Sequence, residues 1–211
     1  MISMDGERSR RVLSPRMPST RGRFASLKSR RMVHFESQLE RDFCYQLEFD
    51  PSVLRFREQP ATISIRYRGK WHRYTPDLAA ERRDGITIYE VKPRRRAVRS
   101  EMQDVFDAAQ EHFSEQGYRY QVVTEDDIRR EPLFGNIKML LRYAGHPLMD
   151  DVVSRAQDWL RFHGPISITE FAEHFDGDNQ GLLLAYALIA QRFANAPIHT
   201  VVIDPDSWIE A

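Results

Sequence analysis

Two short segments on either side of one turn constrain the fold more than any other feature of this sequence. Thr75–Asp77 places an acidic residue directly after a proline, and Glu90–Lys92 begins thirteen residues after Asp77. Between them Arg82–Gly85 is a strong hairpin-turn sequence, so we expect the flanking segments to be antiparallel neighbours. Asp77 should end a tyrosine-rich strand, and side chains that alternate along the next strand should point Glu90 and Lys92 the same way. The pattern predicts two carboxylates and an ammonium group at the ends of neighbouring strands.

That combination of groups suits phosphodiester hydrolysis. Carboxylate oxygens are the ligands that Mg²⁺ prefers, and Mn²⁺ should substitute for it. Lys92 is then placed to orient or deprotonate a water molecule, or to stabilise a phosphate oxyanion. The ordinary alternative is a set of solvated or paired charges on an exposed strand face. Glu90 shares its face with Ile86 and Ile88, and a charge at the edge of a buried surface needs a partner or a metal.

Composition bounds the class of protein. The chain has 211 residues, enough for one domain of ordinary size and a second small one. It has no run of eighteen apolar residues and no apolar segment near its Arg-rich start, so we expect neither a membrane span nor a secretory signal. Cys44 is the single cysteine. A disulfide within the chain is therefore excluded, and a reducing, cytoplasmic location is expected.

The net charge of zero is made of opposite parts. Residues 1–31 hold nine Lys or Arg and two acidic residues, whereas residues 146–211 hold three basic and ten acidic ones. We expect residues 1–31 to be a flexible basic arm that binds the nucleic-acid backbone, with a solubilising tail as the alternative. A net charge of −7 over residues 146–211 favours a protein partner there over DNA, with an acidic domain that merely packs against the nuclease core as the alternative.

Periodicity predicts an α/β core followed by a helical region. In the core we expect helices over 35–49 and 98–116, a short helix over 126–130, and strands over 62–67, 71–77, 86–92 and 118–123. Farther on, helices are expected over 149–162, 167–175 and 182–193, with a strand over 198–203. The predicted fold is a mixed sheet flanked by helices over 32–125, with a small helical, winged-helix-like domain over 126–211.

The first predicted helix begins with a capping-box sequence. Ser37 and Glu40 fit that motif, in which the Glu40 side chain bonds back to the Ser37 N–H. Read this way, Glu40 has a structural role and no chemistry.

Several separate blocks of the sequence resemble one family. The order and spacing of these blocks are similar to those of the TnsA transposon-end endonucleases, which belong to the restriction-endonuclease-like PD-(D/E)xK superfamily. The segment Thr124–Ile128 and the helical tail fit the family's C-terminal region less specifically. The blocks that carry the resemblance are Phe35–Phe43, Leu47–Val53, Arg57–Pro60, Tyr74–Asp77 and Tyr89–Pro93.

The resemblance implies a set of site residues. Glu40 corresponds to the acidic residue of the helix, with Glu36 as the alternative one turn earlier. Asp77 corresponds to the central metal ligand, and Glu90 and Lys92 to the last pair. Some members of the family have glutamine at the Glu90 position, whereas this chain keeps the carboxylate. Metal ligation is thus expected from Asp77, Glu90 and Glu40. From its place near the strand that leads to the site, Gln59 is expected to position the phosphate, with loop packing as the alternative. Contacts with phosphates are expected from Arg94, Arg95 and Arg96, which follow the site directly, with a solvated basic turn as the alternative.

The resemblance also implies a reaction and its partners. The expected activity is Mg²⁺-dependent cleavage of the strand whose 5′ end lies at the transposon terminus. A DDE-type, TnsB-like transposase cuts and joins the other strand, and an AAA+, TnsC-like ATPase controls both. Two alternatives stay open: a stand-alone restriction-like or junction-resolving nuclease, and a DNA-binding assembly subunit that has lost catalysis.

Overall fold

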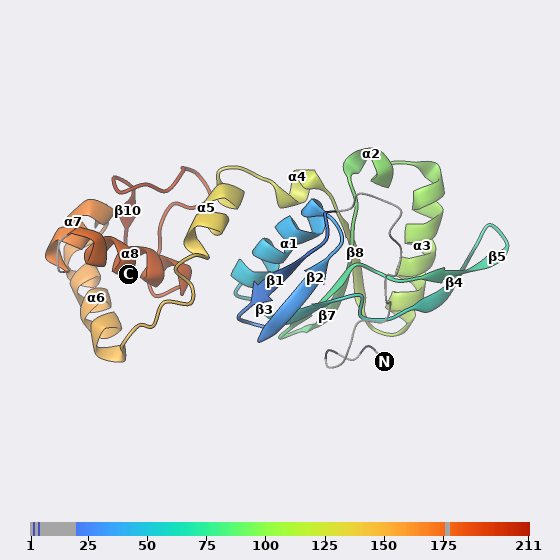
Figure 1. The fold of residues 1–211 in the computed structure, drawn as a ribbon, viewed down its shortest axis with the longest axis horizontal. Coiled ribbons are helices and arrows are strands. Elements are labelled where there is room, and N and C mark those ends of the chain that lie inside the picture. Colours follow the sequence, from blue (N-terminus) through green and yellow to red (C-terminus); the bar gives the residue numbers. More distant parts are fainter. Residues whose placement is uncertain (1, 3, 5–19, 176–177) are drawn as a thin grey trace. The chain divides into compact units, whose positions relative to one another are not determined.

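The computed structural model describes residues 2, 4, 20–175 and 178–211. The chain divides into two compact units, Met1–Arg129 and Arg130–Ala211, and each is described by itself (Figure 1). The division falls four residues after the boundary expected at 125/126. The shift has a packing cause, because the short helix α4 (Glu125–Ile128) buries Ile128 in the core of the first unit.

The first unit is built from a four-stranded mixed sheet, two hairpins and four helices of the described residues. The sheet has the order β3-β6-β7-β8, in which β7 pairs antiparallel with β6 and parallel with β8. The strands are β1 (Gly22–Ser26), β2 (Arg31–Phe35), β3 (Val53–Glu58), β4 (Ile63–Tyr67), β5 (Lys70–Tyr74), β6 (Leu78–Arg82), β7 (Gly85–Val91) and β8 (Arg119–Val123). The helices are α1 (Gln38–Phe49), α2 (Arg94–Ala97), α3 (Ser100–Glu115) and α4.

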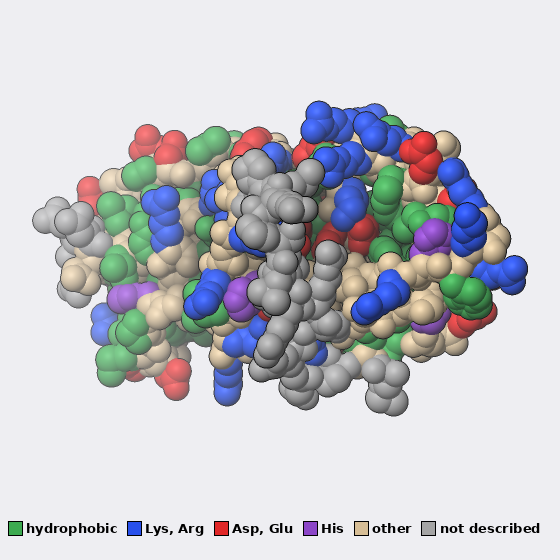
Figure 2. All heavy atoms as spheres, turned by 45° about the vertical axis from the view of Figure 1, so that its right-hand side comes forward, with side chains coloured by type: hydrophobic (Ala, Val, Ile, Leu, Met, Phe, Trp, Pro, Cys, Tyr) green, Lys and Arg blue, Asp and Glu red, His purple; other side chains and the backbone are tan. Residues whose placement is uncertain are grey.

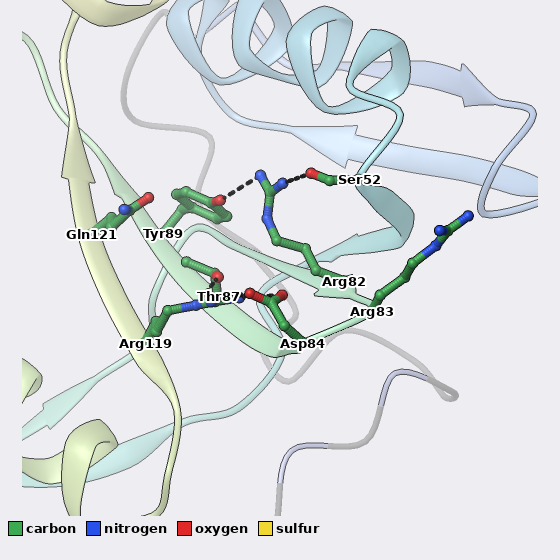
Figure 3. A pocket seen from close by; sticks show the side chains of 8 residues that line it. All are labelled: Ser52, Arg82, Arg83, Asp84, Thr87, Tyr89, Arg119 and Gln121. Carbon is green, nitrogen blue, oxygen red and sulfur yellow. Dashed lines mark hydrogen bonds and ion pairs between the residues drawn. The ribbon is translucent and has the colours of Figure 1, made fainter.

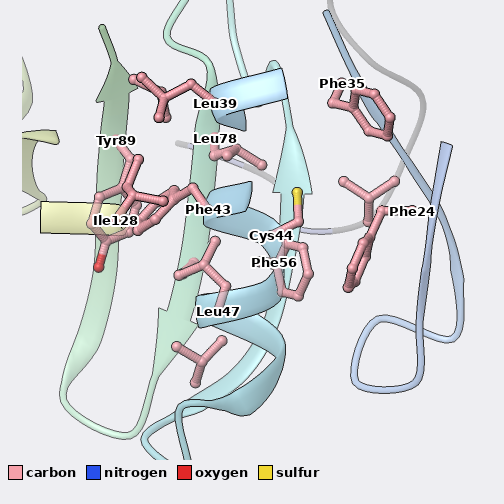
Figure 4. Close-up of a cluster of buried hydrophobic side chains, with 14 residues drawn as sticks. Phe24, Phe35, Leu39, Phe43, Cys44, Leu47, Phe56, Leu78, Tyr89 and Ile128 are labelled. Carbon is pink, nitrogen blue, oxygen red and sulfur yellow. The ribbon is translucent and has the colours of Figure 1, made fainter. Parts of the chain in front are cut away.

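Alternation along the central strands divides the core into two layers. Leu78 and Tyr89 lie in the cluster that α1 covers together with the β1–β2 hairpin (Figure 4). Ala79 and Ile88, one position away on the same strands, lie in the cluster covered by α3 and the β4–β5 hairpin. The sheet is therefore sandwiched between helices, as the alternating pattern requires. The expected mixed sheet with flanking helices is confirmed.

The helix α1 begins later than predicted. Ser37 is its N-cap, and the Ser37 hydroxyl accepts a hydrogen bond from the Glu40 N–H. Phe35 lies in β2 instead of the helix, but it still packs in the same cluster as Leu39 and Phe43. A hydrophobic residue just before a helix start commonly packs back in this way. Phe35 therefore fits the i, i+4 apolar spacing of the helix although its backbone is extended, which is why the predicted helix began too early.

The predicted flexible arm is too long. Residues 22–31, assigned to it, form β1, its turn and the start of β2, which pair antiparallel. The hairpin is fixed to α1 by Glu48, which accepts hydrogen bonds from the Ser26 hydroxyl at 2.6 Å and the Leu27 N–H at 3.0 Å. Phe24 supplies apolar burial that the basic composition of this stretch conceals. Of the other residues of the expected arm, residues 1, 3 and 5–19 lie outside the described residues.

Asp77 is at the start of a strand and not at the end of one. The expected strand over 71–77 is interrupted at Thr75 and Pro76, and β5 pairs only with β4, in a ribbon separate from the main sheet. Asp77 directly precedes β6 and still meets β7 as expected, since its N–H donates to the Tyr89 carbonyl at 3.1 Å. Proline lacks the N–H that a ladder needs, so it separates the two strands.

The second unit is mainly helical. Its described elements are α5 (Leu133–Leu140), α6 (Asp150–His163), β9 (Ile166–Ser167), α7 (Ile168–His174), α8 (Asp178–Ala190) and β10 (Trp208–Ile209). Two-residue strands β9 and β10 pair antiparallel. The helical character expected for this region is confirmed. No helix of the described residues is long and apolar enough to cross a membrane.

The strand expected over 198–203 is absent from the structure. Asn136 of α5 provides the partners for this backbone: its side-chain amide donates to the carbonyls of Ile198 at 2.8 Å and Val201 at 2.7 Å. The Ile203 N–H in turn donates to the Asn136 side-chain oxygen at 2.9 Å. Buried backbone groups need partners of some kind, and here a side chain supplies them in place of a neighbouring strand. The terminal strand of this unit is instead β10.

Candidate active site

The backbone brings Asp77, Glu90 and Lys92 together at one end of the central strand pair. The Asp77 carboxylate accepts the Val91 N–H at 2.8 Å and the Lys92 ammonium at 3.1 Å. That ammonium also lies 2.6 Å from a Glu90 oxygen. One cation thus bridges two carboxylates, as the alternation of side chains along β7 predicted.

Burial and mutual repulsion perturb this cluster. Burial, followed by the nearby Asp77 carboxylate, raises the pKa of Glu90 to about 7, although Lys92 and Tyr74 act in the opposite direction. Burial alone would lower the pKa of Lys92, but the Asp77 and Glu90 carboxylates outweigh it and raise that pKa. Lys92 therefore stays a cation, while Glu90 holds a proton more readily than an ordinary glutamate. A single ammonium does not offset the repulsion between both carboxylates.

Two tyrosines that sequence reasoning missed complete the surroundings of Glu90. The Tyr74 hydroxyl donates to the second Glu90 oxygen at 2.6 Å and lies 2.8 Å from the Tyr120 hydroxyl. Burial, followed by the Glu90 charge, raises the pKa of both phenols, so both stay protonated. A signal was present in the sequence, since a buried tyrosine hydroxyl requires a partner and Tyr74 precedes Asp77 by only three residues.

Glu40 has the capping role and also lies within the field of the cluster. Its carboxylate accepts the Glu36 N–H at 2.8 Å and the Ser37 hydroxyl at 2.9 Å. The predicted partner was the Ser37 N–H, so the reach is one residue farther back than expected. Burial, followed by the Asp77 charge, raises the pKa of Glu40 to about 7. Capping and proximity to the site are therefore compatible, and a catalytic role for Glu40 stays a prediction.

Gln59 lies beside Asp77 through the backbone. Its N–H donates to the Asp77 carbonyl at 2.9 Å, and its side-chain amide donates to Glu36 at 2.9 Å. Its side-chain oxygen is buried without a hydrogen-bond partner, and its φ of 41° is in the left-handed region that non-glycine residues rarely adopt. A strained residue with an unpaired acceptor fits a place at the margin of a site. The Gln59 hydrogen bond also gives the Glu36 side chain a partner outside the Asp77–Lys92 ion pair.

The donor set fits a hard divalent cation in its chemistry. Glu40, Asp77 and Glu90 all offer carboxylate oxygens as ligands. The Asp77 charge contributes to the raised pKa values of both Glu40 and Glu90. A bound cation relieves such repulsion. Among the residues that the structure describes, no three His, Cys, Asp or Glu side chains are grouped closely enough to hold a metal ion. In this arrangement Lys92 bridges Asp77 and Glu90 instead.

The three arginines expected to contact DNA begin directly after the site. Arg94–Arg96 lie in α2, and all three are exposed. Arg94 is already engaged, because its N–H donates to Glu125 at 2.7 Å and its guanidinium pairs with Asp126. Figure 2 shows Lys and Arg side chains gathered around a smaller group of acidic side chains on the face turned forward there. The nucleic-acid contacts themselves stay a prediction.

A polar pocket of about 400 Å³ lies around the turn between β6 and β7 (Figure 3). Two of its three arginines are paired within the protein. Arg82 donates to Tyr89 at 2.9 Å and pairs with Asp50, and Arg119 pairs with Asp84. The pocket has no buried acidic pair of the kind that marks the Asp77 cluster, since Asp84 is its one acidic lining residue, so we assign it no part in the chemistry.

The fold and the cluster together define a class of protein. A mixed sheet between helices, with Asp77 before one central strand and Glu90 and Lys92 at the end of the next, is the arrangement expected of a PD-(D/E)xK core. A family model, the TnsA-like endonuclease N-terminal domain, matches residues 50–125. The chain carries this TnsA-like endonuclease domain, and the recognition of the TnsA type from the sequence is confirmed. The comparison with curated proteins found no match.

The matched segment covers part of the predicted site. Gln59, Asp77, Glu90 and Lys92 lie within residues 50–125, whereas Glu40 precedes them. The match gives the domain its family without assigning a role to any of these residues.

Proposed function

We propose that this protein is the metal-dependent DNA endonuclease subunit of a heteromeric transposase. In this role it cleaves the strand whose 5′ end lies at the transposon terminus during cut-and-paste transposition. One observation carries the proposal: Asp77 and Glu90 share the Lys92 ammonium, at 3.1 and 2.6 Å, within a TnsA-like endonuclease domain. Burial of an incompletely neutralised acidic pair is costly for a purely structural cluster and is typical of a functional site.

Asp77 and Glu90, with Glu40 completing the acidic group, would hold Mg²⁺ or its substitute Mn²⁺. When bound, such an ion supplies Lewis acidity toward a phosphate oxygen and lowers the pKa of a water molecule. The Val91 N–H and the Tyr74 hydroxyl fix the orientation of the Asp77 and Glu90 carboxylates at 2.8 and 2.6 Å. The carboxylates are thus oriented before any substrate arrives, which favours rapid and specific chemistry.

Lys92 acts as a cation in this proposal. The two carboxylates raise its pKa, which favours stabilisation of negative charge on the phosphate over removal of a proton from water. Because Lys92 contacts the same oxygens that would ligate the ion, we expect ion binding and the Lys92 ion pairs to compete. Gln59 would position the phosphate through its unpaired oxygen by way of a water molecule, and Arg94, Arg95 and Arg96 would contact the DNA backbone.

The partners in the proposal follow from the family and from charge. They are double-stranded DNA at the transposon ends, a DDE-type TnsB-like transposase and an AAA+ TnsC-like ATPase. The acidic C-terminal residues 146–211 would contact a protein partner through a winged-helix-like domain, with an association rate that falls as salt rises. The cytoplasmic location expected from the lone cysteine belongs to the same proposal.

Strand cleavage at a matched transposon end tests the proposal. Duplexes labelled at either 5′ end are incubated with Mg²⁺ and the full chain, with and without the cognate transposase, beside an Asp77→Asn variant. The expected result is a metal-dependent nick on the 5′-end strand that the variant does not make. Equal cleavage of unrelated DNA without the transposase would favour a stand-alone nuclease. No cleavage under any of these conditions would favour a non-catalytic assembly subunit.

A further inference from the structure

The β4–β5 ribbon has the charge of a nucleic-acid-binding element. Residues 63–74 hold four Lys or Arg and no Asp or Glu. Among the described residues the two strands pair only with each other, and they extend past α3, away from the main sheet (Figure 1). The outer surface of this ribbon is distinct from the Arg94–Arg96 helix and from the carboxylate cluster, and nothing in the proposed chemistry uses it.

The register of the ribbon separates an inner face from an outer face. Ile65 and Tyr74 point inward and are buried in the α3 cluster. On the other face Arg66 lies directly opposite Trp71, and Arg73 follows Trp71 by two positions on the same strand. All three outer side chains are exposed, and Trp71 has 70% of its surface accessible. The outer face is therefore an aromatic side chain flanked by two guanidinium groups.

The ribbon is fixed at its base and along its length. Tyr74, its last residue, donates to Glu90 at 2.6 Å, and the Thr62 and Thr75 hydroxyls meet at 2.8 Å across the base. Nearer the tip, Arg68 pairs with Asp104 of α3. The ribbon is consequently held against α3 and tied directly to the candidate active site, with its outer face oriented in advance.

The outer cations lack partners inside the protein. Over the described residues, Arg66 and Arg73 have no ion pair or side-chain hydrogen bond, in contrast to Arg68 on the same ribbon. Exposing a tryptophan to this extent is unfavourable, and exposed aromatic residues beside unpaired arginines commonly mark binding surfaces. Two unpaired guanidinium groups, on a ribbon without an acidic residue, are complementary to a polyanion.

We propose that the outer face of the β4–β5 ribbon binds duplex DNA beside the phosphodiester held in the active site. The inference rests on the proposed function for the identity of the substrate. A two-stranded ribbon fits the major groove, which is roughly 12 Å wide. At about 3.4 Å per residue, Trp71 is roughly 10 Å along the strand from Tyr74, a span of about three base pairs.

The chemistry of the face assigns separate tasks to its residues. Arg66 and Arg73 contact phosphates, which fixes the position and direction of the duplex without reading its sequence. Trp71 packs its ring on sugars or base edges in the groove. Because Tyr74 joins the ribbon to Glu90, a duplex positioned by the ribbon is positioned relative to the carboxylates as well.

DNA-binding measurements on the full chain test the proposal. Binding of a labelled duplex is followed by fluorescence anisotropy in EDTA, so that cleavage does not interfere, over a series of salt concentrations. For an Arg66→Ala/Arg73→Ala double variant we expect affinity to fall about tenfold or more, and the slope of log K against log salt to decrease by about two units. Trp71→Ala should weaken binding severalfold with an unchanged slope.

A matched control removes two exposed arginines elsewhere in the same unit. Arg23→Ala/Arg83→Ala changes the net charge equally, and both positions are exposed. Unaltered thermal unfolding should accompany every variant, since the outer side chains support no buried contact. Identical affinities and slopes for the ribbon variant and this control would overturn the proposal. So would normal DNA binding by the ribbon variant together with lost binding to the transposase, which would make the ribbon a protein contact.

The experiment separates this inference from the proposed endonuclease activity. A wild-type chain that binds duplex DNA through Arg66 and Arg73 but never cleaves it keeps the ribbon proposal and removes the endonuclease. If the wild-type chain cleaves DNA and the ribbon variant binds DNA as tightly as wild type, the endonuclease proposal stands and the ribbon proposal is wrong.

Discussion

Glu58 and Glu90 are two buried glutamates on strands of the same sheet, and their surroundings differ in one respect. They are 5% and 3% exposed. Glu58 has its own cation, since Arg31 contacts it at 2.6 Å and the His34 ring at 3.0 Å. Glu90 shares the Lys92 ammonium with Asp77. The two glutamates are therefore similarly buried, but Glu58 has a cation to itself and Glu90 does not.

The pKa values follow that difference. Burial alone would raise the pKa of Glu58, but the hydrogen bond and charge of Arg31 together with backbone hydrogen bonds outweigh it, and the pKa is lowered. For Glu90, burial and Asp77 outweigh Lys92, and the pKa is raised. Glu58 is thus a completed ion pair within the fold, whereas the Asp77–Glu90 pair keeps an excess of negative charge. A cluster that remains under-neutralised is suited to bind a cation from outside the chain.

The first and largest expected effect comes from Asp77→Asn. Asparagine still accepts the Val91 N–H that Asp77 accepts at 2.8 Å, but it removes one carboxylate from the crowded cluster. Cleavage at a transposon end should be abolished, while the melting temperature should hold or rise because repulsion with Glu90 and Glu40 is relieved.

The matched change on the other side of the comparison is Glu58→Gln. It should lower the melting temperature and leave cleavage per folded molecule unchanged. Calorimetric melting and single-turnover cleavage measure both effects. An Asp77→Asn protein that melts early yet still cuts DNA would assign Asp77 to structure.

Lys92→Ala should produce the next largest effect. Cleavage should fall by about a hundredfold or more, the scale of a lost charge-stabilising group. Binding of Mg²⁺ should be retained or tightened, because the ammonium no longer competes for the Asp77 and Glu90 oxygens. Single-turnover kinetics and titration calorimetry provide the two readouts. Near-normal turnover would remove Lys92 from the mechanism.

Arg31→Ala is the control for loss of a cation beside a buried glutamate. It takes the partner from Glu58 as Lys92→Ala takes it from Glu90. We expect lower stability and unchanged cleavage, because the Arg31–Glu58 pair has no part in the chemistry.

The two glutamates should impose opposite pH dependence on stability. With a folded pKa of about 7 against an unfolded value of about 4.3, Glu90 binds more protons in the native state within that window. Stability should therefore fall as the pH rises from about 4.3 to 7, by on the order of 2 kcal/mol. For Glu58 the folded pKa is lowered, so its contribution is present above about pH 4.3 and is lost on acidification.

Melting temperatures between pH 3 and 8 check these signs. Glu90→Gln should reduce the fall in melting temperature toward neutral pH. A smaller fall should remain because of Glu40, whose pKa is also raised. Glu58→Gln should flatten the decline toward acid. The same slope in wild type and Glu90→Gln would show that Glu90 is an ordinary anion.

Much of the site was predictable because its signals are local. The turn at Arg82–Gly85 and the alternation along β7 were enough to predict the meeting of Asp77, Glu90 and Lys92. Tyr120 was missed because it reaches Glu90 only through the Tyr74 hydroxyl and a parallel strand pairing distant in sequence. The β1–β2 hairpin was missed because its apolar residues are few and its basic composition dominates.

The same limit explains the errors in the second unit. The apolar run at 198–203 has the pattern of a strand, but its backbone partners come from Asn136, more than sixty residues earlier. A sequence pattern shows which residues are buried more reliably than it shows which groups satisfy their backbone.

The smallest expected effect comes from removing a single hydrogen bond, the one that Tyr74 donates to Glu90. The Tyr74 hydroxyl donates to Glu90 and lowers its pKa against the larger opposing effects. Tyr74→Phe should therefore raise the pKa of Glu90 further and move the acid limb of the cleavage profile to higher pH, with a severalfold loss of rate near pH 7. Tyr120→Phe is the control, because Tyr120 contacts Tyr74 and has no hydrogen bond of its own to Glu90 among the described contacts. Its acid limb should move less. Equal shifts in both variants would mean that packing of the two rings, and not the hydrogen bond to Glu90, sets the protonation of the site.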